Sequence, residues 1–239
     1  MVKKRSARPV VLVGDADPFP DPRRYDAEGL VAIGGMLSPQ RIELAYRSGI
    51  FPWYGEGYMP LWWSPEPRGV ITVESLHVSR RLQRTIARGG FELSWNRCFR
   101  DVMTACSERR EDGTWIIPEM IDAYEVVHRQ GNAHSLEVWQ GDLLVGGIYG
   151  IQYGRLFCAE SMFHRATDMS KVALVAMVRS LFAAGIRAFE VQFVTDHLAR
   201  MGAFEMPRAD YLELARTASF ESFRLGNPLD GCDKGLSCS

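Results

Sequence analysis

The segment from Gly49 to Arg68 constrains this chain most, because it combines residues that oppose regular structure with residues that favour burial. Its sequence, GIFPWYGEGYMPLWWSPEPR, includes four prolines, three glycines, three tryptophans, two tyrosines and one phenylalanine. Proline removes a backbone donor and is excluded from helix interiors and central strands. We therefore expect a long ordered loop, which joins a small N-terminal domain (residues 1–66) to a main domain (residues 67–218).

Composition places the chain among globular proteins. It has 239 residues, of which 46% are hydrophobic and 24% charged, and its formal net charge is −1. A polyanionic partner must therefore meet a local basic patch, because the whole surface is not basic. The five cysteines form no CxxC pair, which favours reduced thiols over disulfides or a metal site. No apolar run is long enough for a membrane span or a signal peptide, so we expect a cytoplasmic protein.

The pattern along the main domain is mixed. Residues 1–28 are expected to be irregular, Ser38 caps a helix that starts at Pro39, and residues 219–239 form a loose tail. Strands are predicted at 70–73, 91–94, 135–140, 143–152, 155–160 and 188–194. Helices are predicted at 79–88, from an N-cap at Asn96 through 106, at 118–131, from Asp168 or Ser170 to 184, at 196–201 and at 208–217. This order indicates an α+β protein with a mainly antiparallel sheet, and it resembles a GNAT-like acyltransferase core.

Some of the aromatic residues are candidates for nucleic-acid binding. A flat indole accepts any nucleobase face, and each stacked base contributes about 1–3 kcal/mol. Trp53 and Trp115, each in a turn, are the better candidates for such stacking. Trp62 and Trp63 are more easily explained as a structural staple between the two domains.

An arginine-rich segment follows the aromatic one. Between residues 78 and 110 there are eight arginines and three acidic residues, so the local net charge is +5. The helical spacing of Arg80, Arg84 and Arg88 places them on one stripe, opposite Leu82 and Ile86. A solvated helix face explains this as well as a contact with phosphates does, although arginine binds phosphate through two parallel hydrogen bonds.

Two predicted strands carry polar residues where a cleft could form. Alternation places Cys158 and Glu160 on one face of their strand, with Phe157 and Ala159 on the other. In FEVQF, Glu190 and Gln192 share a face. A salt bridge from Glu160 to Arg165 or Lys171, and an edge strand with a wet face, are the simpler explanations. The alternative is a polar cleft that receives a cationic substrate.

Read together, these segments resemble the leucyl/phenylalanyl-tRNA–protein transferases over residues 27–215. FPWY with LWWSP, GTWI and ESMF in this order is the most specific part of the match. The full set of matching segments is GLVAIGGMLSP (29–39), AYRSGIFPWY (45–54), LWWSPEPRGV (61–70), LHVSR (76–80), GTWI (113–116), AHSLEVW (133–139), LVGGIYG (144–150), FCAESMF (157–163), SKVAL (170–174) and the run from 192 to 212.

The resemblance implies transfer of Leu or Phe, and possibly Met, from aminoacyl-tRNA to proteins that begin with Arg or Lys, which marks them for degradation as N-degrons. This transfer is expected to require neither a metal nor another cofactor. The enzyme is expected to be a monomer. The implied binding residues are Trp53 and Trp115 for the 3′-terminal adenosine of the tRNA. For the acceptor stem they are Arg80, Arg81, Arg84 and Arg88. For the transferred side chain they are Ile148, Phe157, Met162, Met177 and Phe189.

The implied chemistry is aminolysis of an ester by the α-amine of the acceptor. Gln192, oriented by Glu190, would hydrogen-bond the amine and relay its proton, while Glu160 and Glu190 would attract the cationic acceptor side chain. One departure stands out, because the family has Asp-x-Gln where this chain has Glu190-Val191-Gln192. The extra methylene puts the rate or the choice of acceptor in question.

Two other classes remain open. A GNAT-type acyl-CoA N-acyltransferase predicts a QxxGxG-like phosphate-binding turn before a helix, and none is present. A non-catalytic RNA-binding module explains the tryptophans and arginines but not Glu160 and the Glu190/Gln192 pair.

Overall fold

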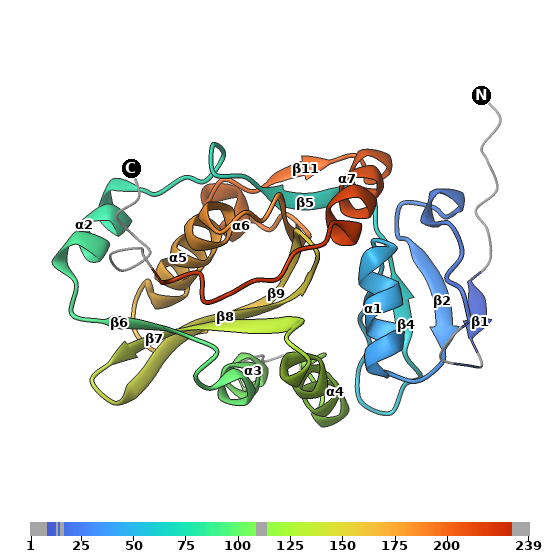
Figure 1. The fold of residues 1–239 in the computed structure, drawn as a ribbon, viewed down its shortest axis with the longest axis horizontal. Helices are drawn as coiled ribbons and strands as arrows, with labels where there is room; N and C mark the ends of the chain where they lie inside the picture. The colour runs from blue at the N-terminus through green and yellow to red at the C-terminus, as the bar shows by residue number, and fades with distance from the viewer. Residues whose placement is uncertain (1–8, 13, 15–16, 109–113, 231–239) are drawn as a thin grey trace.

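The computed structural model describes residues 9–12, 14, 17–108 and 114–230, which form two β-sheets flanked by helices (Figure 1). The mixture of helix and strand with a distinct N-terminal unit agrees with the sequence prediction. Outside the described residues lie two of the eight arginines (Arg109 and Arg110), Gly113 of the GTWI segment and two of the five cysteines (Cys232 and Cys238). Within those described residues, no helix is both long enough and apolar enough to cross a bilayer.

The N-terminal sheet has four strands in the order β1-β2-β4-β3. Strand β1 (Val10–Leu12) pairs in parallel with β2 (Leu30–Gly34), and the other pairs are antiparallel. The prediction of an irregular lead-in over residues 1–28 is therefore wrong at β1 and at a short 3-10 helix, η1 (Pro22–Arg24). The reason is that three residues of parallel pairing leave almost no periodic signal in the sequence.

The aromatic segment is only partly the loop that its prolines predict. It contributes β3 (Phe51–Pro52) and β4 (Leu61–Trp63), and β4 lies inside the sheet between β2 and β3. The prolines are accommodated because Pro52 lies in the edge strand, where a missing donor is tolerated. Trp62 is fully buried and donates to the Gly34 carbonyl at 2.9 Å, so it supports the N-terminal sheet itself, and the staple between domains stays a prediction.

The main sheet has seven strands in the order β11-β5-β10-β9-β8-β7-β6. Strands β9 and β10 pair in parallel, and every other neighbouring pair is antiparallel. The strands are β5 (Arg68–Ile71), β6 (Glu92–Trp95), β7 (Ala133–Gln140), β8 (Leu143–Tyr153), β9 (Leu156–His164), β10 (Ala188–Gln192) and β11 (Phe204–Met206). Sequence reasoning did not identify β2 or β11, and it ended β9 at Glu160, four residues too early.

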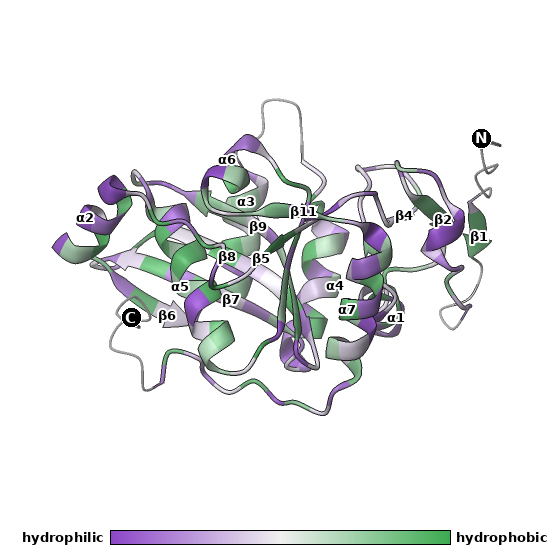
Figure 2. Cartoon of the chain, turned by 90° about the horizontal axis from the view of Figure 1, so that it is seen from above, coloured by the Kyte–Doolittle hydropathy of each residue, from purple (hydrophilic) through white to green (hydrophobic). Residues whose placement is uncertain are grey.

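Helices cover both faces of the main sheet (Figure 1). Helix α5 (Met169–Ala183) packs on one face, and α3 (Phe99–Ser107) and α4 (Pro118–Arg129) pack on the other. The remaining helices are α1 (Pro39–Arg47), α2 (Arg80–Arg88), α6 (Asp196–Arg200) and α7 (Arg208–Phe220). Figure 2 shows that α5 is largely hydrophobic, whereas α2 is hydrophilic over most of its length.

Two of the predicted helix caps differ in the structure. Ser38 and Ser79 cap α1 and α2 through their side chains, as predicted. Asn96 instead adopts a left-handed conformation with φ of 58° and accepts a hydrogen bond from the Ser135 backbone, so α3 begins after Cys98. Asp168 precedes α5, but its carboxylate pairs with Lys171 rather than with the helix backbone.

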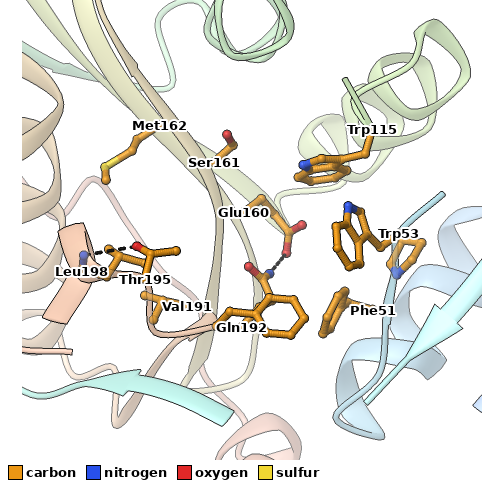
Figure 3. A pocket seen from close by; sticks show the side chains of 12 residues that line it. Phe51, Trp53, Trp115, Glu160, Ser161, Met162, Val191, Gln192, Thr195 and Leu198 are labelled. Carbon is orange, nitrogen blue, oxygen red and sulfur yellow. Dashed lines mark hydrogen bonds between the residues drawn. The ribbon is translucent and has the colours of Figure 1, made fainter. Parts of the chain in front are cut away.

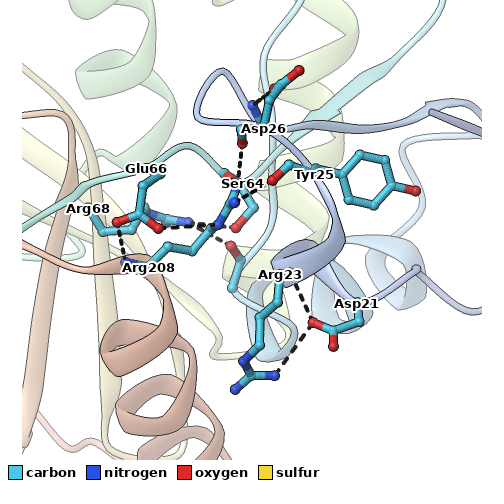
Figure 4. A network of polar contacts seen from close by, with 10 residues as sticks. Asp21, Arg23, Tyr25, Asp26, Ser64, Glu66, Arg68 and Arg208 are labelled. Atoms are coloured by element: carbon cyan, nitrogen blue, oxygen red, sulfur yellow. Dashed lines mark hydrogen bonds and ion pairs between the residues drawn. The ribbon is translucent and has the colours of Figure 1, made fainter. Parts of the chain in front are cut away.

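A buried arginine ties α7 to the N-terminal unit (Figure 4). The Arg208 guanidinium donates to the backbone carbonyls of Tyr25, Asp26 and Ser64 at 2.6–2.9 Å. Its backbone N–H donates to Glu66 at 2.9 Å. These hydrogen bonds join segments up to 183 residues apart and hold the N-terminal unit against the main sheet.

Candidate active site

A cleft of about 340 Å³ opens where β3 meets the second half of β9 and the end of β10. Its lining changes character along its length (Figure 3). Phe51, Trp53 and Trp115 lie at one end, and the aliphatic residues Met162 and Leu198 lie at the other. The polar pair Glu160 and Gln192 lies between them.

The aromatic end is a partly exposed surface that is held in place by packing and by a hydrogen bond. Trp53 is 44% exposed, and its ring packs on Trp63 and Phe193 with centroid distances of 6.1 and 5.7 Å. The Trp63 indole donates to the Trp53 carbonyl at 2.8 Å, which fixes the backbone of the turn. The structure thus brings Trp53 and Trp115 into one cleft, although 62 residues separate them in the chain.

Two backbone irregularities position the polar pair. Glu160 is the extra residue of a β-bulge, because Ser161 pairs with Tyr149 while Ala159 pairs with Gly150. Gln192, at the end of β10, has a φ of 55°, a left-handed value that is unfavourable for any residue but glycine and often marks a functional site. The outcome is a hydrogen bond of 2.8 Å from Gln192 Nε2 to Glu160 Oε1.

Two tyrosines that sequence reasoning missed complete this network. The Tyr46 hydroxyl, on α1, donates to Glu160 Oε1 at 2.7 Å. It also lies 2.7 Å from the hydroxyl of the fully buried Tyr124, on α4. Since the single proton of Tyr46 is directed to Glu160, Tyr124 donates to Tyr46. The AYRSGIFPWY motif contains Tyr46, so the segment was identified but its function was not.

The environment of Glu160 favours the protonated carboxyl. Burial raises its pKa to about 8, and the hydrogen bonds from Tyr46 and Gln192 offset only part of that rise. The simpler explanation, a salt bridge to Arg165 or Lys171, is wrong. Arg165 pairs with Glu108 at 3.0 Å, and Lys171 pairs with Asp168 at 2.8 Å.

Glu190 lies behind the cleft rather than in it. Its side chain is 1% exposed and forms a salt bridge of 2.7 Å with the buried Arg68. Its Oε1 also accepts the backbone N–H of Gln192 at 2.6 Å. Glu190 therefore contacts Gln192, as the resemblance implies, but it is not available to a cation entering the cleft.

The aliphatic end leads into a second cavity of about 60 Å³. Of the five residues implied for the side-chain pocket, Ile148 and Met162 line it. Phe157, Met177 and Phe189 lie in the same hydrophobic cluster with at most 1% exposure. They form the layer behind the cavity wall and do not border the cavity itself.

The predicted arginine stripe is exposed on α2. Leu82 is buried on the opposite side of that helix. Arg81, Arg84 and Arg88 border a surface groove of about 590 Å³ beside the start of α5. Arg81 also pairs with Asp168 at 3.4 Å, so part of its charge is already compensated.

Comparisons with known proteins identify the family. The model of the leucyl/phenylalanyl-tRNA protein transferase family matches residues 70–216, and the model of its N-terminal domain matches residues 35–66. A protein named leucyl/phenylalanyl-tRNA–protein transferase from Anaeromyxobacter sp. (strain Fw109-5) is 50% identical over 215 residues, which is 89% of this chain and 87% of that protein. Those of Nitratidesulfovibrio vulgaris and Methylococcus capsulatus are 46% and 50% identical, over 90% and 83% of this chain and 94% and 86% of their own lengths.

One solved structure, of L-PGS from Bacillus licheniformis, covers 71% of this chain and 57% of that chain, with 13% identity and a TM-score of 0.38. That likeness is too distant to bear on the fold. The two family models together match every residue that lines the cleft. The chain therefore belongs to the leucyl/phenylalanyl-tRNA protein transferase family.

Proposed function

We propose that this enzyme, an aminoacyltransferase, moves Leu or Phe from aminoacyl-tRNA to the N-terminal Arg or Lys of a protein. The observation that supports this best is the order of surfaces along the cleft: aromatic, polar, aliphatic (Figure 3). The 3′ end of an aminoacyl-tRNA has the same order, with a flat adenine, a polar ester and an apolar side chain. Adenine would stack at Trp53 and Trp115, and the ester would lie over Glu160 and Gln192.

The reaction replaces a C–O bond with a C–N bond. The free α-amine of the acceptor attacks the ester carbonyl, a peptide bond forms, and the ribose 3′ oxygen leaves and takes up a proton. The ester is already activated, so the enzyme has to align the reactants and direct the proton. With its pKa raised to about 8, Glu160 is matched to an α-amine, whose usual pKa is about 7.7–8.0.

Gln192 would orient the attacking amine. Its Nε2 is engaged by Glu160, so its amide oxygen is left to accept an N–H from the acceptor amine. In this proposal Glu190 is a positioning residue that holds the strained backbone of Gln192 through the hydrogen bond of 2.6 Å. The extra methylene of Glu190, relative to the aspartate of the family, then acts on the placement of Gln192.

Glu160 is the carboxylate that a cationic acceptor would meet in the cleft. An arriving cation lowers the pKa of a nearby carboxyl group, so binding of the acceptor would ionise the base that the reaction needs. This supports acceptors that begin with Arg or Lys, and with them a function in marking N-degron proteins. The proposal has further parts. The enzyme would also transfer Met, and its α2 arginines would contact the acceptor stem. It would be a cytoplasmic monomer with a GNAT-like core and a domain boundary at residue 66.

The test is transfer of radiolabelled leucine from Leu-tRNA to peptides that begin with Arg, Lys, Asp or Glu. Transfer to the Arg and Lys peptides is expected, and Gln192→Ala should abolish it while binding of tRNA persists. Gln152→Ala, which changes a glutamine outside the cleft, serves as the matched control.

The other outcomes separate the alternatives. Transfer only to the Asp or Glu peptides would keep the chemistry and overturn the acceptor assignment. Binding of tRNA without transfer to any peptide would favour an RNA-binding module. Acetylation of peptides from acetyl-CoA would favour a GNAT-type N-acyltransferase.

A further inference from the structure

The two cavities of the site adjoin each other. The larger one, of about 340 Å³, and the smaller one, of about 60 Å³, share several lining residues. These shared residues are Glu160, Ser161, Met162, Val191, Gln192 and Leu198. A side chain attached to an ester over Glu160 and Gln192 therefore enters the small cavity directly, past Met162 and Leu198 (Figure 3).

The walls of the small cavity differ in how firmly they are held. Ile148 and Ala159 belong to the central strands β8 and β9, and Leu174 belongs to α5; each is at most 7% exposed. Close-packed side chains of this kind resist displacement. Leu198 is different, because it belongs to α6, a helix of five residues of which none is fully buried.

Helix α6 is fastened at its two ends and lightly packed between them. At its start, the Thr195 hydroxyl accepts the Leu198 N–H at 3.3 Å. After its end, the Met201 carbonyl accepts the His77 N–H at 3.0 Å. Gly202 approaches so closely that an added Cβ would lie 1.8 Å from the Ser75 carbonyl oxygen. Leu198 projects into the cavity between these two anchors.

The volume of the small cavity suits one of the two side chains better than the other. The small cavity measures about 60 Å³, much less than the 340 Å³ of the cleft beside it. The side chain of leucine has four carbons and that of phenylalanine has seven, so leucine needs less room in this cavity. The ring of phenylalanine therefore requires one wall to move outward, and α6 is the wall that is packed least firmly.

We propose that Leu198 is a specificity-determining residue, whose side chain closes the amino-acid pocket around leucine and moves outward with α6 to admit phenylalanine. This inference rests on the proposed function. It adds a contact residue that the sequence did not single out. It also assigns the balance between the two substrates to one side chain on a short helix, rather than to the buried aromatic layer of Phe157 and Phe189.

The experiment measures kcat/KM for Leu-tRNA and for Phe-tRNA with one Arg-initiated peptide. Leu198→Ala is expected to raise the Phe-to-Leu ratio at least tenfold, within the roughly 10- to 200-fold that a few methylene groups confer in a hydrophobic pocket. Leu198→Phe, which narrows the same opening, should lower the ratio. Leu93→Ala is the matched control, because Leu93, on β6, is a partly buried leucine that lines neither cavity.

Each outcome has a distinct meaning. If both Leu198 variants keep the wild-type ratio while transfer persists, the inference is overturned and the proposed function stands. An equal change of the ratio in Leu93→Ala would also overturn it, because the effect would then be indirect. If the wild-type protein transfers neither amino acid, the proposed function itself fails. Thermal unfolding of each variant establishes that it is folded before the ratio is compared.

Discussion

Two glutamates on neighbouring strands, Glu160 on β9 and Glu190 on β10, are held in opposite ways. Glu190 is sealed from solvent and paired with the Arg68 guanidinium at 2.7 Å. Glu160 lines the cleft, and the hydrogen bonds that it accepts come from neutral groups, the Tyr46 hydroxyl and the Gln192 amide.

The difference shows how one fold separates a structural carboxylate from a chemical one. A fixed cation beside Glu190 compensates its charge, so that carboxylate serves as an anchor. Neutral donors stabilise the charge of Glu160 less than a cation would, and burial raises its pKa to about 8. The first carboxylate is held by a buried guanidinium, and the second can exchange a proton near neutral pH.

Removal of the Arg68 cation from its ion pair with Glu190 should have the largest effect, and the effect is on stability. Arg68→Met leaves the buried charge of Glu190 uncompensated, which should lower the free energy of unfolding by about 3–5 kcal/mol. Urea denaturation measures this loss. The double variant Arg68→Met/Glu190→Met should recover part of the stability, because it removes both charges. A loss below about 1 kcal/mol in the single variant would contradict the anchor function.

Removal of the Tyr46 hydroxyl, which donates to Glu160, should affect catalysis more than stability. Tyr46→Phe removes a hydrogen bond to Glu160 that contributes about 2 kcal/mol, so kcat should fall roughly 30-fold with KM for aminoacyl-tRNA little changed. This hydrogen bond lowers the Glu160 pKa, so the acid limb of the pH–rate profile should move above its wild-type position.

Tyr54→Phe is the control for Tyr46→Phe, because the Tyr54 hydroxyl is buried and has no hydrogen-bond partner within the described residues. The two variants should therefore differ in their pH profiles. If Tyr46→Phe loses stability and activity together and its profile does not move, the hydroxyl is only structural.

The pH dependence of stability should distinguish the two glutamates further. The Glu160 pKa is raised from 4.5 to about 8, so the folded state holds a proton that the unfolded state releases at lower pH. Stability then falls as pH rises from about 4.5 to about 8. Glu160→Gln should flatten this fall in urea denaturation at pH 5, 6.5 and 8.5. An unchanged slope would show that Glu160 titrates normally.

The smallest expected effect concerns arginines without a carboxylate partner. In the described residues Arg84 and Arg88 form no salt bridge, unlike Arg81, which pairs with Asp168. The binding constant for tRNA should fall as the salt concentration rises. If each arginine holds one phosphate, Arg84→Gln and Arg88→Gln should each make the slope of log binding constant against log salt concentration less negative by about 0.9. Arg216→Gln, on α7, is the control, since Arg216 pairs with Glu213. Equal slopes in all three variants and the wild type would overturn the assignment to the acceptor stem.

The sequence predicted the long, periodic elements well and the short strands poorly. Alternation placed Glu160 and Phe157 on opposite faces of β9 correctly, because side-chain direction follows local geometry. The bulge at Glu160 and the positive φ of Gln192 leave no trace in hydrophobic periodicity. Strand β4 escaped prediction because its stability comes from its two neighbouring strands and not from its own proline-flanked residues.

The contacts of Glu160 and Glu190 were not predicted, because their partners lie far away in the chain. Tyr46 and Glu160 are separated by 114 residues, and Arg68 and Glu190 by 122. One sequence without its fold cannot choose among the many arginines and tyrosines for each glutamate. The family motifs did place Tyr46 in a matched segment, so the signal was present but carried no indication of its partner.

The hydrogen bonds of Arg208 have a consequence for synthesis of the chain. They reach back to Tyr25, Asp26 and Ser64, so the N-terminal unit gains its final support only after α7 has left the ribosome. The order of translation and the order of assembly are therefore opposed: the first segment made is among the last to be secured. Because that segment carries Trp53 and Tyr46, a nascent chain that lacks α7 holds every residue of the cleft and still lacks the support that aligns them.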